Sequence, residues 1–211
     1  MKTIVIFIIT LILSLNCVAQ SNGTTSSAEI DINQNIPYVK IGAGYWIPTS
    51  KLSHFLNNAP FFELGIVIPD DSYSRSFELG VQLVIPQQEN FFLLRDNNED
   101  YEIEATTILN AYLKLNKYIW EKDRNRLELT FGLGISSIFL DPVTRAGDAV
   151  LDYDNINSFL VAPGLSYTFS FKDKSIIQIS FDMQYTPFKM ERGATKDLNS
   201  FSMLPKIAYR F

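Results

Sequence analysis

The chain contains a single histidine, His54, and this residue is the first whose chemistry must be weighed. A histidine acts as a general base when a nucleophile and an orienting carboxylate lie within about 3 Å of its ring. Ser53 is adjacent, but neighbouring side chains normally point in different directions. Four carboxylates that could approach His54 lie far along the chain: Asp141, Asp148, Asp152 and Asp154. Nothing in their spacing places any of them beside His54. We therefore expect a solvated loop histidine and no catalytic residue.

Acidic residues gather in two polar stretches and could hold a divalent cation: Asp96, Glu99 and Asp100, then Asp148, Asp152 and Asp154. The segment Asp152-Tyr153-Asp154-Asn155 starts like a calcium-binding loop but lacks the later glycine and glutamate of that pattern. Gly132-Leu133-Gly134 lies within a strand-like pattern, so it is not a phosphate-binding loop. We expect solvated loop charge, with no metal site and no cofactor.

The amino terminus predicts export. Lys2 is followed by an apolar run over 4–15, which is too short for a membrane-spanning helix and typical of a signal peptide, residues 1–20, cleaved after Ala19 or Gln20. The alternative is a lipoprotein signal acylated at Cys17, although Asn16 occupies a position where such signals prefer a small residue. Cys17 is the only cysteine, so cleavage leaves a chain without a thiol or a disulfide.

The remaining chain of roughly 190 residues is long enough for one domain after a flexible polar lead over 21–35. Its formal charge is −6, the −5 of the whole chain less the +1 of Lys2, so a nucleic-acid partner is not expected. No later stretch offers 18 consecutive apolar residues, which excludes a helical membrane protein. The sequence is nevertheless rich in aromatics, with 16 Phe and 10 Tyr.

Eight segments alternate between apolar and polar residues, the period of a β-strand with two different environments. They cover 37–47, 60–69, 75–86, 103–118, 126–139, 157–171, 175–187 and 200–211. Their connections are alternately long and short, with long ones at 48–59, 87–102, 140–156 and 188–199. An even number of strands with one elaborated end predicts an all-β, antiparallel, up-and-down transmembrane β-barrel, whose long loops are extracellular.

One face of each segment is apolar, whereas the other carries glycines, small polar residues and eight charges: Lys40, Glu63, Glu78, Lys114, Glu128, Asp182, Lys206 and Arg210. An eight-stranded barrel has an interior just wide enough for side chains, and charges enclosed there must be paired. We therefore predict a lumen charge network inside and the apolar face toward lipid. Lys206 or Arg210 is expected to pair with Asp182 or Glu128. A soluble barrel with a polar exterior is the alternative.

Aromatic residues gather near the strand ends, as in the interfacial girdles of membrane barrels. One set is Tyr38, Phe77, Phe169, Phe171, Tyr209 and Phe211, and the other is Tyr45, Phe62, Phe159, Tyr185 and Phe201. Pro163 and Pro205 each remove a hydrogen-bond donor from a predicted strand, so we expect a bulge, or a last strand that begins after Pro205. The apolar run 91–94 could cover the barrel mouth, contact lipid or a partner, or pack within its own loop.

The last strand ends on an aromatic residue, with Ile207, Tyr209 and Phe211 on the lipid parity. This strand and three short patterns give residues 36–211 a resemblance to a known family. The patterns are Gly42-Ala43-Gly44-Tyr45-Trp46, the two Glu-Leu-Gly repeats at 63–65 and 78–80, and Ala208-Tyr209-Arg210-Phe211. The chain resembles the small outer-membrane β-barrels of the OmpA and OmpX type, and more closely the outer-membrane β-barrel domains of the Bacteroidetes type.

This resemblance implies a porin-like architecture in a Gram-negative cell envelope. The partners that it implies are outer-membrane lipid, lipopolysaccharide and the barrel assembly machinery, which would recognise the terminal strand. The protein is expected to be a monomer. We expect a non-enzymatic structural or surface-interaction role through four extracellular loops. The alternatives are a rim enzyme that acts on lipid A or peptides and uses His54, and a soluble periplasmic ligand-binding barrel.

Overall fold

The computed structural model describes residues 36–70, 74–96, 99–122, 125–142, 155–171 and 175–211, which all belong to one compact unit, Ile32–Phe211. The predicted signal peptide over 1–20, its alternative lipid anchor at Cys17 and the polar lead over 21–35 lie outside the described residues, as do Asp148, Asp152 and Asp154. Among the described residues, no helix is long and apolar enough to cross a membrane.

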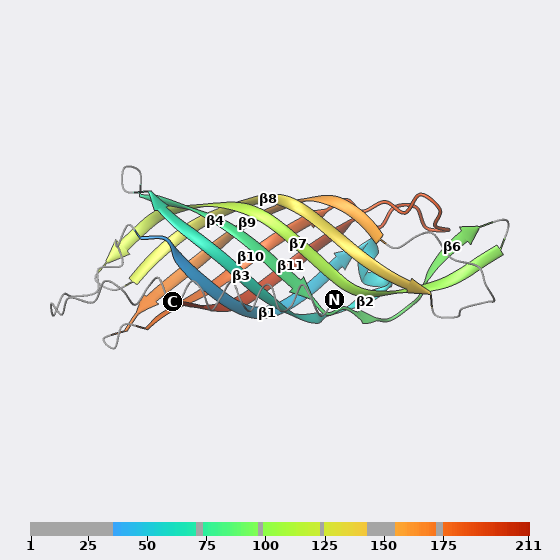
Figure 1. The fold of residues 1–211 in the computed structure, drawn as a ribbon, viewed down its shortest axis with the longest axis horizontal. Coiled ribbons are helices and arrows are strands. Elements are labelled where there is room, and N and C mark those ends of the chain that lie inside the picture. Colours follow the sequence, from blue (N-terminus) through green and yellow to red (C-terminus); the bar gives the residue numbers. More distant parts are fainter. Residues whose placement is uncertain (1–35, 71–73, 97–98, 123–124, 143–154, 172–174) are drawn as a thin grey trace. The chain divides into compact units, whose positions relative to one another are not determined.

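Eight long antiparallel strands form a closed barrel (Figure 1). They are β1 (Tyr38–Ser50), β3 (Ala59–Asp70), β4 (Arg75–Val84), β7 (Glu99–Lys122), β8 (Asn125–Pro142), β9 (Asn155–Ser170), β10 (Ile176–Thr186) and β11 (Ser200–Arg210). Each pairs with its neighbours in chain order, and β11 returns to β1. The predicted up-and-down topology is confirmed, because all eight alternating segments form barrel strands.

Short elements lie at the end of the barrel that carries the long connections, which we call the loop end. We call the opposite end the turn end. They are the 3₁₀ helix η1 (Lys51–His54) and the strands β2 (Leu56–Asn57), β5 (Gln87–Gln88) and β6 (Phe92–Asp96). β2 pairs with β5, and β6 pairs with the part of β7 that extends beyond β4. The sequence predicted plain loops here, since these pieces are too short for a periodic pattern.

The expectation of a bulge at Pro163 or Pro205 is wrong. β11 begins at Ser200, and Pro205 lies opposite Phe181 of β10 in an unbroken register. On its other side the pairing with β1 is interrupted between Lys206 and Met203 and then resumes in the same register. Pro163 likewise lies opposite Phe131 of β8 in an unbroken register. Its pairing with β10 is interrupted between Gly164 and Val161 and then resumes in the same register. Each proline lacks one donor toward one neighbour, so it weakens a single ladder without shifting it.

The register shifts lie in β7 instead, between Ala105 and Thr107 and between Tyr118 and Trp120. They occur near the two ends of the barrel, where bulges commonly adjust strand direction. No proline marks either position, so the sequence carried no signal for them.

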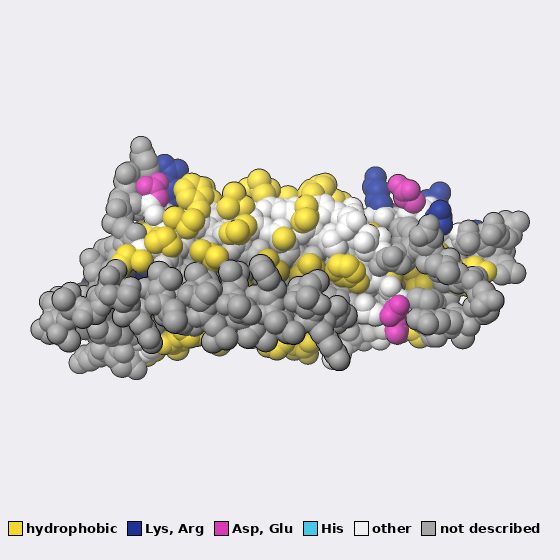
Figure 2. Space-filling view, in the orientation of Figure 1, with side chains coloured by type: hydrophobic (Ala, Val, Ile, Leu, Met, Phe, Trp, Pro, Cys, Tyr) yellow, Lys and Arg dark blue, Asp and Glu magenta, His cyan; other side chains and the backbone are white. Residues whose placement is uncertain are grey.

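The outer face is apolar and the inner face polar over the middle of the barrel. In β4, the side chain of Leu79 is 60% exposed, whereas that of the adjacent Glu78 is 1% exposed. Figure 2 shows hydrophobic side chains along the strands and charged ones toward the ends of the visible face. The predicted assignment of the two faces is therefore confirmed for the described strands.

Tyr38 is the exception among the predicted girdle residues. Its ring lies beneath the guanidinium group of Arg210, 3.6 Å from ring centroid to Cζ, and it lines a pocket inside the turn end. The reason is parity: Tyr38 alternates with Lys40 on β1, so both side chains point inward. Its assignment to the lipid girdle is wrong.

Candidate functional site: the closed lumen

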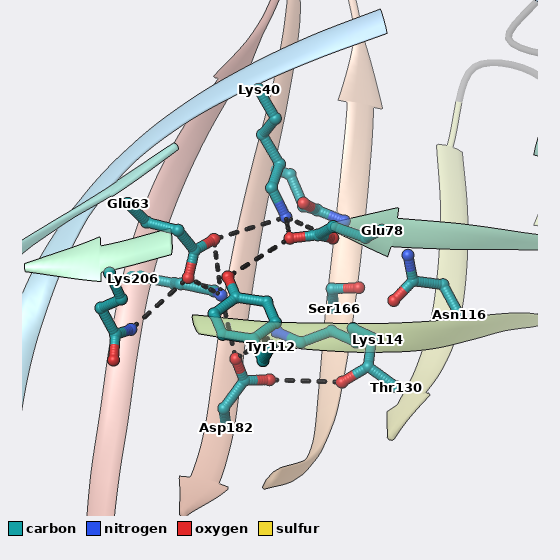
Figure 3. A network of polar contacts seen from close by, with 12 residues as sticks. Lys40, Glu63, Glu78, Tyr112, Lys114, Asn116, Thr130, Ser166, Asp182 and Lys206 are labelled. Atoms are coloured by element: carbon teal, nitrogen blue, oxygen red, sulfur yellow. Dashed lines mark hydrogen bonds and ion pairs between the residues drawn. The ribbon is translucent and has the colours of Figure 1, made fainter. Parts of the chain in front are cut away.

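Six charged side chains form a continuous chain of ion pairs in the lumen (Figure 3). Lys40 Nζ lies 2.7 Å from a carboxylate oxygen of Glu78 and 3.4 Å from Glu63. Lys206 Nζ lies 2.6 Å from Glu63 and 2.9 Å from Asp182. Asp182 also accepts from Lys114 Nζ at 2.7 Å. Three lysines thus alternate with three carboxylates, and the chain of charges is neutral.

Neighbouring polar groups complete this network. The Tyr112 hydroxyl donates to Glu78 at 3.4 Å, and the Thr130 hydroxyl donates to Asp182 at 3.2 Å. Asn110 donates to Gln82, which in turn donates to Glu63. Because a buried charge is costly unless both its charge and its lone pairs are satisfied, these additional hydrogen bonds are what make an enclosed ion network tolerable.

Glycines provide the space for the network. A Cβ atom on Gly164 would collide with Asp182 Oδ1 and the Thr130 hydroxyl, and one on Gly80 would collide with the Tyr112 ring. These backbone positions must therefore lack a side chain if the large inward groups are to lie between them. The alternation of glycine with long charged residues in the sequence reflects this packing.

Two of the eight charges predicted for the network lie apart from the ion-pair chain. Glu128 is buried and accepts hydrogen bonds from the hydroxyl of Ser166 and the amide of Gln178, both at 3.3 Å. Arg210 stacks on Tyr38. Of the expected pairings, the Lys206–Asp182 contact is present, while Lys206 also reaches Glu63, a partner that sequence reasoning did not name.

Sequence reasoning missed Arg126 and Tyr112 as lumen residues. Arg126 is 4% exposed, stacks on Tyr118 at 3.9 Å and pairs with Glu121 at 3.1 Å. It shares the parity of Glu128 in β8, and this signal could have identified it. Tyr112 shares the parity of Lys114 in β7 and could have been found in the same way.

The loop end of the lumen is filled by an apolar plug, which we define by residues contributed from three loops: Leu52, Leu56, Phe92, Leu94, Phe188, Met190 and Leu198. Phe92 stacks on Phe55, with ring centroids 4.7 Å apart. The plug continues into inward side chains of the barrel, among them Trp46 and Phe61. Of the alternatives for the run 91–94, coverage of the barrel mouth is the one that the structure shows, through Phe92 and Leu94.

Hydrogen bonds to backbone carbonyls hold the three loops together. Arg95 N donates to Arg192 O at 2.8 Å, and Ala194 N donates to Leu93 O at 2.9 Å. The side-chain amide of Asn90 donates to His54 O at 2.7 Å. The loops therefore form one connected layer above the plug.

Two exposed ion pairs lie in this layer, and each lowers the pKa of an aspartate. A hydrogen bond from Arg95 at 2.8 Å lowers the pKa of Asp100. A hydrogen bond from Lys51 at 2.6 Å, together with one from the backbone N–H of Asn199, lowers the pKa of Asp197. Both carboxylates are bound by cations of the chain itself.

The residues that could support rim chemistry do not come together in the described part of the chain. His54 is exposed, the Ser53 hydroxyl donates to Ser50 O at 2.7 Å, and Asp141 is exposed at the end of β8. No group of three or more His, Cys, Asp or Glu that could hold a metal occurs among the described residues.

At the turn end, a small pocket opens below the ion network. It is lined by Tyr38, Lys40, Arg126, Glu128, Thr168, Ile176, Gln178 and Arg210. It has room for about one water molecule. From turn end to loop end, the lumen thus contains this pocket, the ion network and the apolar plug.

A closed barrel with apolar side chains outside and an ion network inside defines the class of small membrane-type β-barrels. The fold is shared with neisserial surface protein A at a TM-score of 0.56, although the sequences are 8% identical over 83% of this chain and 97% of that protein. The attachment invasion locus protein of Yersinia pestis follows at 0.48, with 12% identity and the same coverage, and OprG of Pseudomonas aeruginosa at 0.46, with 10% identity over 83% and 95%.

No protein-family profile matches this chain, and no curated protein is similar to it at the sequence level. The structural likeness therefore concerns the fold.

Proposed function

We propose that this chain is an integral outer-membrane protein with a closed lumen, which acts structurally or through surface interactions of its loop end. The observation that carries the proposal is the inverted polarity of the barrel. Large apolar side chains such as Phe62, Leu113 and Ile135 are 54–63% exposed on the outer face, while Lys40, Glu63 and Lys206 are 3–4% exposed inside. Such an exterior is costly in water and favourable in a bilayer.

Aromatic side chains at the two ends of the outer face support the same placement. Phe159, Tyr185 and Phe201 form a contiguous group near the loop end, with centroid distances of 6.3 and 6.4 Å. Near the turn end, Trp120 packs on Tyr167 and Tyr209 on Phe211. Amphipathic rings prefer the interface between the hydrocarbon core and the headgroups, so these groups would mark the two membrane surfaces.

The filled lumen favours a role other than solute conduction. A solute would have to displace both the buried apolar plug and the neutral ion chain, and the contents of the lumen leave room for about one water molecule at the turn end. The loop layer is the part of such a protein that reaches beyond the membrane, and its mutual hydrogen bonds make it a preorganised surface for a partner.

The partners proposed for the barrel itself are outer-membrane lipid and lipopolysaccharide, with a monomer as the functional unit. The side chains of Ile207, Tyr209 and Phe211 are 59%, 41% and 66% exposed on the outer face. This position supports their contact with lipid in the folded barrel, and we propose that the assembly machinery reads the same three residues before β11 pairs with its neighbours.

Cell fractionation tests the proposal. An integral barrel will remain with the outer membrane after carbonate washing, will need detergent for extraction and will change its gel mobility on heating. In planar bilayers the purified protein should show no large, stable conductance. Recovery in the soluble periplasm would favour the ligand-binding alternative, and large single-channel steps would contradict the closed lumen.

The enzyme alternative is tested through its one candidate residue. His54→Ala should leave the lipid A acyl profile and the peptidase activity of the membrane unchanged, since His54 is exposed and contributes a backbone carbonyl to its hydrogen bond with Asn90. A changed acyl profile would support the enzyme instead.

A further inference from the structure

The seam between β9 and β10 is sparsely paired at the loop end. Its ladder is unbroken from the turn end as far as Asp182–Gly164, and above that level a single pair, Tyr185–Val161, remains. β9 continues beyond this pair to Asn155 and stays paired with β8, but no strand of the described residues pairs with this part of β9 on the β10 side. The upper part of β9 is therefore held from one side.

Two prolines cause this loss of pairing. The interruption at Pro163 shows that its nitrogen faces β10, where the carbonyl of Met183 lies opposite, and the same register sets Pro187 opposite Phe159. A proline has no N–H to donate, so the carbonyls of Met183 and Phe159 lack their ladder donors. Both carbonyls lie near the ring contact of Phe159 with Tyr185, which belongs to the proposed membrane interface. Separation of the two strands therefore breaks few hydrogen bonds at this level.

The opposite flank of the same hairpin is better attached. β11 pairs with β1 continuously from Ile47–Met203 to Ser50–Ser200, above the interruption at Pro205. The loop-end half of the β10–β11 hairpin, residues 183–203, is thus fixed along its β1 edge and has lost most ladder bonds along its β9 edge.

The connection between the two strands, the fourth loop, carries part of the apolar plug. Its residues Phe188, Met190 and Leu198 are at most 1% exposed. Leu198 N donates to Phe188 O at 3.0 Å, and Met190 N donates to Lys196 O at 2.9 Å, so the fourth loop is bonded to itself. It can therefore move as one piece with the hairpin that carries it.

Two backbone hydrogen bonds fasten the fourth loop to β6, which lies beside it at the loop end (Figure 1). Arg95 N donates to Arg192 O at 2.8 Å, and Ala194 N donates to Leu93 O at 2.9 Å. These bonds lie across the mouth from the β1 edge, so they have to break if the hairpin swings outward.

Two buried polar atoms without a partner lie close to the loose seam. One is Oγ of Ser158, on the part of β9 beyond the ladder, and the other is Oδ1 of Asn199, at the end of the fourth loop. Buried polar atoms are rarely left unsatisfied, so these two indicate that the packing beside the seam is incomplete.

We propose that residues 183–203 form a hinged lid over the lumen. The lid pivots on the β1–β11 ladder, opens along its β9 edge and carries Phe188, Met190 and Leu198 away from the mouth. Its two hydrogen bonds to β6 are the latch. The ion chain lies deeper in the lumen and is not part of the lid, so the barrel stays closed to solutes when the lid is open. The lid thus adds a movement to the proposed closed barrel.

Amide hydrogen exchange of the full chain in detergent micelles, measured residue by residue by NMR, tests the lid. The amides of Tyr185 and Leu198 should exchange about tenfold faster than those of the unbroken β4–β7 ladder between Val81 and Val84. They should also share one dependence on denaturant, because a cooperative unit opens as a whole. Equal protection of the two walls, or unrelated denaturant dependences for Tyr185 and Leu198, would overturn the proposal.

A donor restored at the seam makes the test specific. Pro163→Val supplies an N–H to the Met183 carbonyl and should slow the exchange of both Tyr185 and Leu198 by about fivefold, the effect of one hydrogen bond. Leu165→Val, two residues along on the same face of β9, adds no donor and is the matched control. Heat-modifiable gel migration verifies that each variant is folded. Slower exchange at Tyr185 alone would show that the fourth loop does not move with the seam, and the lid would be wrong.

Thiol reactivity gives a second measurement that does not depend on Pro163. In a Cys17→Ala background, which removes the only native cysteine, Leu198→Cys places a thiol in the lid and Val84→Cys places one in the opposite wall. Both native side chains are 0% exposed. A small thiol reagent should modify the lid thiol about tenfold faster while the barrel stays folded. Equal rates at the two positions would contradict the lid and would leave the conductance test of the closed lumen unaffected.

Discussion

Lys206 and Glu63 form an ion pair of 2.6 Å although their strands, β11 and β3, are not neighbours in the barrel. β1 lies between them, and both side chains reach into the lumen past its glycines, Lys206 opposite Gly44 and Glu63 opposite Gly42. The same lysine reaches Asp182 on β10, so a single ammonium group connects the first and last parts of the chain. Closure of the barrel is therefore stabilised from inside as well as by the β1–β11 ladder.

Neutralising Lys206 should strongly destabilise the barrel. Lys206→Met leaves the Glu63 and Asp182 carboxylates with fewer partners in an enclosed space, and breaking a buried pair from one side costs about 3–5 kcal/mol. Urea unfolding in lipid vesicles, followed by tryptophan fluorescence and gel migration, measures the loss. Lys117→Met, at an exposed position of β7, is the matched control and should remain within about 0.5 kcal/mol of the native chain. Equal midpoints for the two variants would show that the ion chain contributes nothing.

Two glycines of β8 should respond differently to the same substitution. A Cβ atom on Gly134 would collide with the backbone carbonyl of Ala111 and with Tyr112, whereas one on Gly132 would make ordinary contacts of 3.5 Å with Ala162. Gly134→Ala should therefore destabilise the barrel by about 1–3 kcal/mol through overpacking, and Gly132→Ala should have little effect. Parallel unfolding curves of the two variants check the difference. An equal response would argue against the tight approach of β7 to β8 at Gly134.

The apolar plug predicts a contrast between adjacent phenylalanines. Phe92 is 1% exposed and stacks on Phe55, while Phe91 is 40% exposed. Phe92→Ala should lower the free energy of unfolding of the loop layer by about 3–5 kcal/mol by opening a cavity, and Phe91→Ala should cost far less. Amide hydrogen exchange of the segments around Leu52 and Leu198, both fully buried in the plug, reports the loosening directly. Similar protection in both variants would contradict the described plug.

The Lys51–Asp197 pair makes the contact between the first and fourth loops sensitive to acid. Because the pKa of Asp197 is lowered in the folded chain, its contribution is fully present above the ordinary aspartate value of about 4 and is lost as the pH falls through the lowered pKa. Exchange at the Leu52 amide, which donates to Asn199 O, should therefore accelerate in strongly acidic solution beyond its intrinsic pH dependence. Lys51→Met should remove most of this extra pH dependence. An unchanged profile in the variant would assign it to another group.

The arrangement of strands and faces could be predicted from the sequence because both depend on local patterns. A period of two identifies a strand, the alternation of long and short connections indicates a meander, and glycines opposite charges identify the narrow interior. The same patterns placed Lys40, Glu63 and Asp182 on the inner face. Parity also carried the information on Tyr38 and Arg126, since each alternates with a lumen charge that was recognised.

Only the tertiary structure decided which charges meet. Lys206 pairs with Glu63 across an intervening strand, and Lys114 pairs with Asp182 from β7 to β10, across the barrel. Such contacts depend on the height of each side chain along the barrel axis, which is set by strand tilt and stagger and leaves no mark on the local sequence. The sealing of the mouth by Phe92 and the unshifted register at Pro205 have the same origin, because each depends on neighbours far away in the chain.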